Sequence, residues 1–473
     1  MGFFQRIISY ILILLSAILP STTYTEGVVG QPNSFLPSQL TQREDKTISQ
    51  LLYRGLFKYD IYGTLVPDLA ETWILSDDGM VYTIKLKDDQ RWTDGKKIIS
   101  DDLIYTSFMV PDLTGVSTDK IDELTVRYTL PNKYSPFLNL LTIGIMPADA
   151  ETTNNPLKPV SSGDFAVGRV EKRGDAVKKI VIVNRNNDHE IGKIVFRYYS
   201  NEDELEIAAK LGEIDSFLTR DTYDIENFEN YRFPLQGIYY ALFFNLREEK
   251  LQNIELRTSL EKVLPVEDMI VHRGIAVQGA ISRNLFTDES LIFDKHDPEF
   301  NAHLEDVSIT LTIPDVEIHT SFAKEIKQVW EDDLDIDVTI RKIDSEEMLE
   351  KVIAPRKFEV LLYGQEVGRD PDRYEMWHST QKKYPGLNIT GLEHVRVDRA
   401  LEEGRNENMN EKRVVHYDGF QRVVNEEVPV IFLYHPYMNY YVKNHTTGIG
   451  EKYTFTESDR FLDFANWKRL TTN

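Results

Sequence analysis

The sequence predicts a mixed α/β protein with two packed lobes. Its 473 residues, 41% hydrophobic and 11% aromatic, exceed what one hydrophobic core usually serves. Alternating apolar and polar runs in the first part predict strands, and strands that alternate with helices follow in the second part. The chain has no internal repeat and no low-complexity linker. Both lobes are therefore expected to be globular.

The segment 26–130 predicts a sheet with one buried face. Residues 81–86, Val-Tyr-Thr-Ile-Lys-Leu, alternate between apolar and polar side chains. The sequences Asp77-Asp78-Gly79 and Thr93-Asp94-Gly95 predict tight turns, because glycine adopts a positive φ without strain. Trp92 is expected in the core, and a helix with acidic residues in its first turn is expected after Ser100.

The second part predicts β-α-β units. A helix is expected at 202–211 and an uninterrupted apolar strand at 239–245, which we interpret as a crossing between the lobes. Strand 307–313, helix 318–330 and strand 338–340 follow, and this alternation predicts a mainly parallel sheet covered on both faces. Pro429 in the predicted strand 428–434 indicates an edge strand or a strand start.

Charge and composition exclude several classes of partner. The formal net charge of -23 repels phosphate backbones, so nucleic acid is not expected as a partner. The absence of cysteine excludes disulfides, thiolate metal sites and a lipid-modified N-terminal cysteine. The ten histidines are scattered singly, without the close spacing of a helical metal site. We therefore expect neither a metal nor a cofactor.

The N-terminus resembles an export signal. Arg6 precedes an apolar run from Ile7 to Leu19, which ends at Pro20 and a Ser/Thr stretch. This run is shorter than the roughly 20 apolar residues of a comfortable membrane span, so it favours a secretory signal. We interpret 1–25 as a signal peptide or an N-terminal membrane anchor. The protein is then extracytoplasmic, in the periplasm or at the cell surface, and a segment that stays uncleaved would tether it to the membrane.

Sequence motifs do not indicate an enzyme. The chain has no Gly-x-Ser-x-Gly elbow, no Ser-x-x-Lys set, no phosphate-binding glycine loop and no His-Glu-x-x-His. The informative segment is 361–379, where an apolar strand leads into glycines, charged residues and aromatics. This is how an α/β lobe presents a ligand site at the carboxyl end of its sheet. The candidate ligand-binding residues are Gln365, Glu366, Arg369, Asp370 and Trp377. The alternative is an ordinary polar loop with a packed Trp377.

Several ordered motifs resemble the extracellular solute-binding proteins of family 5, the peptide/nickel group of ABC transporters. The resemblance extends from about residue 26 to the C-terminus. Its motifs are Leu-Tyr-Arg-Gly-Leu-Phe-Lys-Tyr-Asp at 52–60, Leu-Val-Pro-Asp-Leu-Ala-Glu-Thr-Trp at 65–73, Ser-Asp-Asp-Gly-Met-Val-Tyr-Thr at 76–83, Trp-Thr-Asp-Gly at 92–95 and Asp-Pro-Asp at 370–372. Several motifs at family-like spacing are more specific than any one of them.

The resemblance implies a type II periplasmic-binding-protein-like clamp with a small extra subdomain in its first lobe. The first lobe is expected to comprise 26–240 and 436–473, with the small subdomain at about 46–157, and the second lobe 241–435. The implied protein is the substrate-binding component of an ABC importer. It would be a monomer that captures an oligopeptide-like ligand between its lobes and delivers it to a permease in the cytoplasmic membrane. Alternatives are a metal chelate, haem or an oligosaccharide as ligand, or an extracytoplasmic hydrolase.

One departure from the family pattern concerns the anchor of the ligand. Many members carry Gly-Trp-x-x-Asp before the Asp-Pro sequence, and that Asp pairs with the α-amino group of a bound peptide. Here Gln365 and Gly368 stand in the Trp and Asp places. Asp370, Glu366 or a residue elsewhere would then hold the amino group, or the ligand is not a free-amino peptide.

Overall fold

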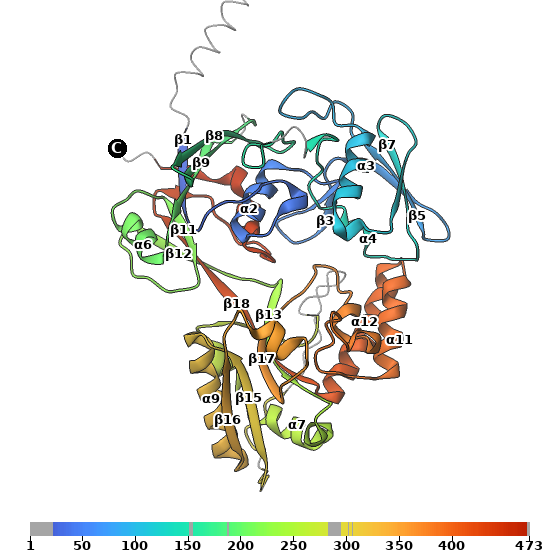
Figure 1. Cartoon of the computed structure of the whole chain (residues 1–473), viewed down its shortest axis with the longest axis vertical. Helices are drawn as coiled ribbons and strands as arrows, with labels where there is room; N and C mark the ends of the chain where they lie inside the picture. The colour runs from blue at the N-terminus through green and yellow to red at the C-terminus, as the bar shows by residue number, and fades with distance from the viewer. Residues whose placement is uncertain are drawn as a thin grey trace, which may run out of the picture.

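The computed structural model describes residues 22–150, 155–186, 189–281, 295–300, 302–304 and 306–470. Figure 1 shows two lobes joined by the long strand 430–443 and by the short segment 235–237. We call residues 22–235 and 437–470 the upper lobe and residues 238–435 the lower lobe. The structure is a mixed α/β fold with two lobes, as the sequence predicts.

One twelve-stranded sheet runs through both lobes. The order of its strands is β16 (Asp337–Ile343), β15 (Ser308–Pro314), β17 (Val360–Glu366), β13 (Ile238–Phe244), β18 (Val430–Lys443), β11 (Ser216–Thr219), β1 (Thr22–Val29), β10 (Ile191–Tyr199), β9 (Ala176–Asn184) and β8 (Phe165–Arg173). Strands β12 (Phe228–Pro234) and β14 (Gly274–Ala276) also pair with β18. Because β18 takes partners in both lobes, it joins them into one hydrogen-bonded unit.

The upper lobe also carries a four-stranded sheet of order β4-β5-β7-β6 and two two-stranded sheets, β2-β3 and β19-β20. Its further strands are β2 (Phe57–Tyr59), β3 (Leu65–Pro67), β4 (Ala70–Leu75), β5 (Val81–Leu86), β6 (Ser117–Lys120), β7 (Thr125–Thr129), β19 (Thr446–Thr447) and β20 (Lys468–Arg469). Its helices are α2 (Arg43–Leu52), α3 (Ser100–Met109), α4 (Phe137–Leu140) and α6 (Glu202–Lys210). The predicted turns are confirmed, since Gly79 and Gly95 have φ values of 72° and 89°.

The lower lobe differs from the sequence prediction in its sheet. Strand β15 is parallel to β16 and β17, but β17 is antiparallel to β13, and β13 is antiparallel to β18. The expectation of a mainly parallel sheet is therefore wrong, because β13 and β18, the strands that connect this sheet to the upper lobe, add antiparallel pairs. The helices are α7 (Ile254–Lys262), α8 (Val266–Ile270), α9 (Glu317–Leu334), α10 (Tyr374–Trp377), α11 (Val395–Asn406) and α12 (Asn410–Glu427).

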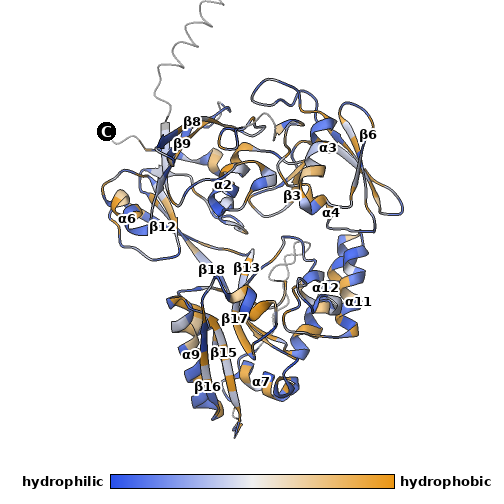
Figure 2. Cartoon of the chain, viewed as in Figure 1, coloured by the Kyte–Doolittle hydropathy of each residue, from blue (hydrophilic) through white to orange (hydrophobic). Residues whose placement is uncertain are grey.

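Apolar side chains on these elements form the cores. In α9, Trp330 is fully buried, and its indole N–H donates to the carbonyl of Leu260 at 2.9 Å. Trp92 is buried in the upper lobe, as predicted. Figure 2 shows hydrophobic residues along β17 and hydrophilic residues over much of α11. Helix α11 therefore turns a polar face to solvent and packs its apolar face against α12.

The end of the chain returns to the upper lobe. Strand β18 begins directly after Pro429, which therefore marks a strand start and not an edge. Beyond β18, the guanidinium of Arg460 pairs with the carboxylate of Glu26 on β1, and both side chains are buried. The hydroxyl of Tyr440 also donates to Glu26, at 2.7 Å. This buried polar cluster fastens the C-terminal segment to the first strand.

The predicted export segment lies outside the described residues up to residue 21. Strand β1 begins at Thr22, and Tyr24 is buried beside Trp467. The folded region therefore starts before the predicted boundary at residue 25. Over the part of the chain that the structure describes, no helix combines the length and apolar character needed to span a bilayer.

His435 lies on β18 where this strand passes from the lower to the upper lobe. Its Nδ1 is 2.7 Å from the carbonyl oxygen of Ile238, and its side chain is buried. Burial lowers the pKa of His435 to about 4, although the bond to Ile238 opposes this shift. The imidazole is therefore neutral in the folded protein at neutral pH.

This burial predicts acid sensitivity. The unfolded chain binds a proton at His435 below about pH 6.5, whereas the folded protein does so only near pH 4. The free energy of unfolding should therefore fall as the pH drops, by about 2 kcal/mol between pH 7 and pH 5 from this group. Urea unfolding of the wild type and of His435→Asn at both pH values measures the effect.

The His435→Asn variant should lose about 2 kcal/mol of the fall in unfolding free energy between pH 7 and pH 5. The exposed His272, changed to Asn, is the matched control and should leave the dependence unaltered. Equal pH dependence in the wild type and in His435→Asn would contradict the assignment.

Candidate functional site

The candidate site is built around the loop 367–373, which leaves the carboxyl end of β17 between the two lobes. The guanidinium of Arg373 is buried and hydrogen-bonds to the backbone of this loop. It donates to the carbonyl oxygens of Asp370 at 2.6 Å, Gly368 at 3.2 Å and Ala280 at 3.1 Å. These bonds fix the backbone of the loop, from which Arg369 and Asp370 contact the upper lobe.

The carboxylate of Asp370 is hydrogen-bonded to other groups of the protein. Its carboxylate accepts two bonds from Arg413 on α12, at 2.6 and 3.0 Å, and one from the backbone N–H of Asp372 at 2.9 Å. The Asp370 and Arg413 side chains are only 10% and 3% exposed. Burial alone would lower the pKa of Arg413, but the Asp370 carboxylate more than offsets this and raises it.

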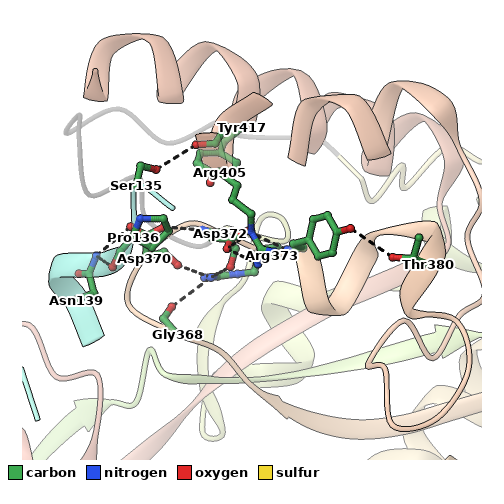
Figure 3. A network of polar contacts seen from close by, with 12 residues as sticks. Ser135, Pro136, Asn139, Gly368, Asp370, Asp372, Arg373, Thr380, Arg405 and Tyr417 are labelled. Carbon is green, nitrogen blue, oxygen red and sulfur yellow. Dashed lines mark hydrogen bonds and ion pairs between the residues drawn. The ribbon is translucent and has the colours of Figure 1, made fainter. Parts of the chain in front are cut away.

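Asp370 also contacts the upper lobe. The Asn139 side-chain amide on α4 donates to its carboxylate at 3.1 Å, and Figure 3 shows the two side chains facing each other across the lobes. Nearby, the backbone N–H of Ser135 donates to the carbonyl of Arg405 at 2.9 Å. The Arg405 guanidinium in turn pairs with Asp372 at 2.7 Å. These contacts form one polar network that spans both lobes.

Arg369 makes a second contact between the lobes. Its Nη2 pairs with the carboxylate of Asp459 at 2.5 Å, and its guanidinium lies over the ring of Tyr59 at 4.3 Å and that of Phe455 at 4.7 Å. Asp459 belongs to the 3₁₀ turn Glu457–Phe461, where the same carboxylate caps the backbone N–H groups of Phe455 and Thr456. A capped turn of the upper lobe therefore pairs with this cation.

Two cavities between the lobes take lining residues from both of them. The first has a volume of about 560 Å³ and lies against α2 and the 3₁₀ turn, with Arg369 as its lower-lobe residue. The second, of about 730 Å³, lies between the segment 130–140 of the upper lobe and residues of α10 and α11, among them Tyr374 and Arg405. The polar network around Asp370 contributes to the wall of the second cavity. Both volumes fall in the range of small-molecule sites.

The structure places the five predicted site residues in different surroundings. Arg369 lines the first cavity, and Asp370 is engaged by Arg413 and Asn139. Gln365 is buried and accepts a hydrogen bond from the hydroxyl of Tyr239 at 2.7 Å. Glu366 is exposed at the end of β17. Trp377 is 1% exposed and packs against Phe420 and Phe432.

The structure adds residues that the sequence analysis missed. Asn139, Tyr59, Asp459 and Arg413 contact the predicted segment from 43 to about 310 positions away along the chain. The sequence Thr456-Glu-Ser-Asp459 has the spacing of a capping box, which was a usable signal for the turn. No local pattern pairs Arg369 with Asp459.

Comparison with known proteins places this geometry in context. Residues 64–273 match the model of the bacterial extracellular solute-binding proteins, family 5. The oligopeptide-binding protein AppA of Bacillus subtilis (strain 168) is 22% identical over 477 residues, which cover 87% of this chain and 85% of that protein.

Solved structures agree with this match. The ABC transporter substrate-binding protein CtaP of Listeria monocytogenes has a TM-score of 0.80 at 20% identity, covering 95% of this chain and 100% of that chain. Bacillus subtilis AppA in complex with a nonapeptide has a TM-score of 0.69 at 19% identity, covering 95% and 99%. At these identities the structural likeness concerns the fold.

The engagement of Asp370 predicts a structural cost for its removal. Asp370→Asn leaves the buried Arg413 without a full countercharge, so the free energy of unfolding should fall by about 3 kcal/mol. Denaturant unfolding monitored by circular dichroism measures this loss. The matched control is Glu403→Gln, which breaks the exposed pair with Arg399 and should cost less than about 1 kcal/mol. A variant as stable as the wild type would contradict this structural role of the Asp370 carboxylate.

Proposed function

The chain belongs to the bacterial extracellular solute-binding proteins of family 5, and we propose that it captures an oligopeptide-like ligand between its two lobes. Members of this family are substrate-binding proteins, and the proposal includes no chemical step. The observation that carries it is the pair of cavities lined from both lobes, which share strand β18. A ligand that contacts both lobes favours the arrangement in which they meet.

The nature of the ligand is inferred from the relatives. AppA of Bacillus subtilis is an oligopeptide-binding protein and has been solved with a nonapeptide. A peptide carries a regular series of main-chain donors and acceptors, which suits a polar cleft between two lobes. Metal chelates, haem and oligosaccharides are the alternatives within the family, and no contact among the described residues favours them over a peptide.

The predicted site residues are assigned to ligand contact or to support of the site according to their surroundings. Arg369 is assigned to ligand contact because it lines the first cavity, and Glu366 because its carboxylate is exposed beside the loop. Gln365 is assigned to the site because it lies on β17 just before the loop, where it bonds to Tyr239. Asp370 is already bonded to Arg413 and Asn139, and Trp377 is enclosed in the core. Their proposed role is to support the site.

The partner and location follow from the same proposal. The ligand would be delivered to an ABC permease in the cytoplasmic membrane, with the N-terminal segment serving as export signal or tether. The two functional lobes would be 26–240 with 436–473, including a small subdomain at about 46–157, and 241–435. Strand β18 crosses the boundary near residue 435, and strand β13 crosses the boundary at residue 240.

A thermal-shift screen tests the proposal. The full chain is heated with pooled peptides of about two to eight residues, and separately with nickel, haem and oligosaccharides. A ligand at about 100 times its dissociation constant should add about 2.7 kcal/mol of stability and raise the unfolding midpoint by a few degrees. The surface variant Glu403→Gln should show the same shift.

Two outcomes would contradict parts of the proposal. If only a non-peptide pool raises the unfolding midpoint, the binding function stands and the peptide is excluded as the ligand. Turnover of a peptide without stabilisation would reject the binding function.

A further inference from the structure

The 560 Å³ cavity carries an excess of positive charge in a strongly acidic protein. Its charged lining side chains are the cations Lys46, Arg54, Lys58 and Arg369 and the carboxylates Asp68, Asp164 and Asp459. The cations outnumber the carboxylates by one, whereas the whole chain has a formal net charge of -23. His189 also lines the cavity.

Two of these carboxylates are already neutralised within the wall. Asp68 accepts bonds from Arg54 at 2.6 and 2.9 Å, and Asp459 pairs with Arg369. Lys46 is exposed at the cavity, and Lys58 lies 3.9 Å from Asp68, which is longer than a hydrogen bond. The wall therefore presents positive charge that its own carboxylates do not fully compensate.

Hydrogen-bond donors in the wall lack acceptors. The side chain of Arg369 is only 10% exposed, and its Nη1 is buried without a partner among the described residues. The hydroxyl of Tyr53, a residue 5% exposed, also has no partner within that set. Burial raises the pKa of Tyr53, so its hydroxyl stays protonated and remains a donor. A buried donor without an acceptor costs free energy, which an acceptor on a ligand would remove.

The cavity is completed by contact between the lobes. Arg369 comes from the lower lobe, and the other described lining residues come from the upper lobe. The rings of Tyr59 and Phe455 flank its guanidinium and fix the direction of its N–H groups. A ligand group held here would therefore be enclosed as the two lobes come together.

We propose that this cavity receives an anionic carboxylate of the ligand, read by Arg369 and supported by Tyr53. The proposal rests on the function proposed above and adds the chemical class of the group that the site selects. Guanidinium groups suit carboxylates because their planar donors match the two carboxylate oxygens. The carboxylate comes either from the C-terminus of a peptide or from an Asp or Glu side chain, and the experiment separates these two sources.

The test compares matched peptide pools on the full chain. The first pool has free C-terminal carboxylates, the second has the same sequences amidated, and the third is amidated but carries Asp and Glu in place of Asn and Gln. Dissociation constants are measured by titration calorimetry. The pool without any carboxylate should bind roughly 10- to 100-fold more weakly than the better of the other two, as expected for loss of a charge-assisted hydrogen bond. Of these two pools, the one that binds more tightly identifies the source of the carboxylate.

Three variants separate charge recognition from closure of the lobes. Arg369→Gln should bring the affinity ratio between carboxylate and amide pools close to one. Asp459→Asn also breaks the contact between the lobes but keeps the guanidinium, so it should preserve that ratio. Tyr53→Phe removes only the hydroxyl and should lower the ratio by a few fold.

The outcomes distinguish the two proposals. Equal binding of all peptide pools by the wild type would overturn the carboxylate site and leave peptide capture intact. An unchanged ratio in both Arg369→Gln and Tyr53→Phe would also overturn it. Failure of every peptide pool to bind would overturn peptide capture, and the carboxylate site with it.

Discussion

Strand β18 is the constraint on which the rest of the structure depends. Its first part pairs with β13 and β14 in the lower lobe, and its last part pairs with β11 and β12 in the upper lobe. The two lobes therefore share backbone hydrogen bonds through one continuous strand, and His435 is buried where the partners change. The loop 367–373 follows β17, which pairs with β13, the neighbour of β18, so its contacts with the upper lobe depend on these strands.

The neighbouring residues Arg369 and Asp370 of that loop have different structural roles. Asp370 is held by the buried Arg413, and Arg369 reaches across to Asp459 and the cavity. The difference follows from their surroundings, because a carboxylate with two charged donors and two further hydrogen bonds has little capacity left for a ligand. A guanidinium with five N–H donors and one ion pair still has donors to offer. The chemistry that reaches the cleft at this point is therefore cationic.

The cationic wall also bears on the departure from the family pattern at Gly368. A side chain added there would meet no atom within 4 Å, so the position has room but carries no carboxylate. The adjacent Arg369 presents the opposite charge. If the cleft reads a carboxylate near this loop, the end of the ligand that lies here differs from a free amino terminus. The local electrostatics, and not the net charge of the chain, then decide which ligand group is accepted.

The sequence by itself determined the fold class, the turns at Gly79 and Gly95 and the β-α-β unit around α9. These features depend on periodicity, glycine conformation and ordered motifs, which are local properties of the chain. Only the tertiary structure decided that β17 lies antiparallel to β13, that Trp377 is enclosed in the core, and that Arg369 meets Asp459 while Asp370 meets Arg413 and Asn139. The physical reason is that ion pairs and burial depend on which distant segments meet in space, and many acidic and basic residues compete as partners in a chain of this charge.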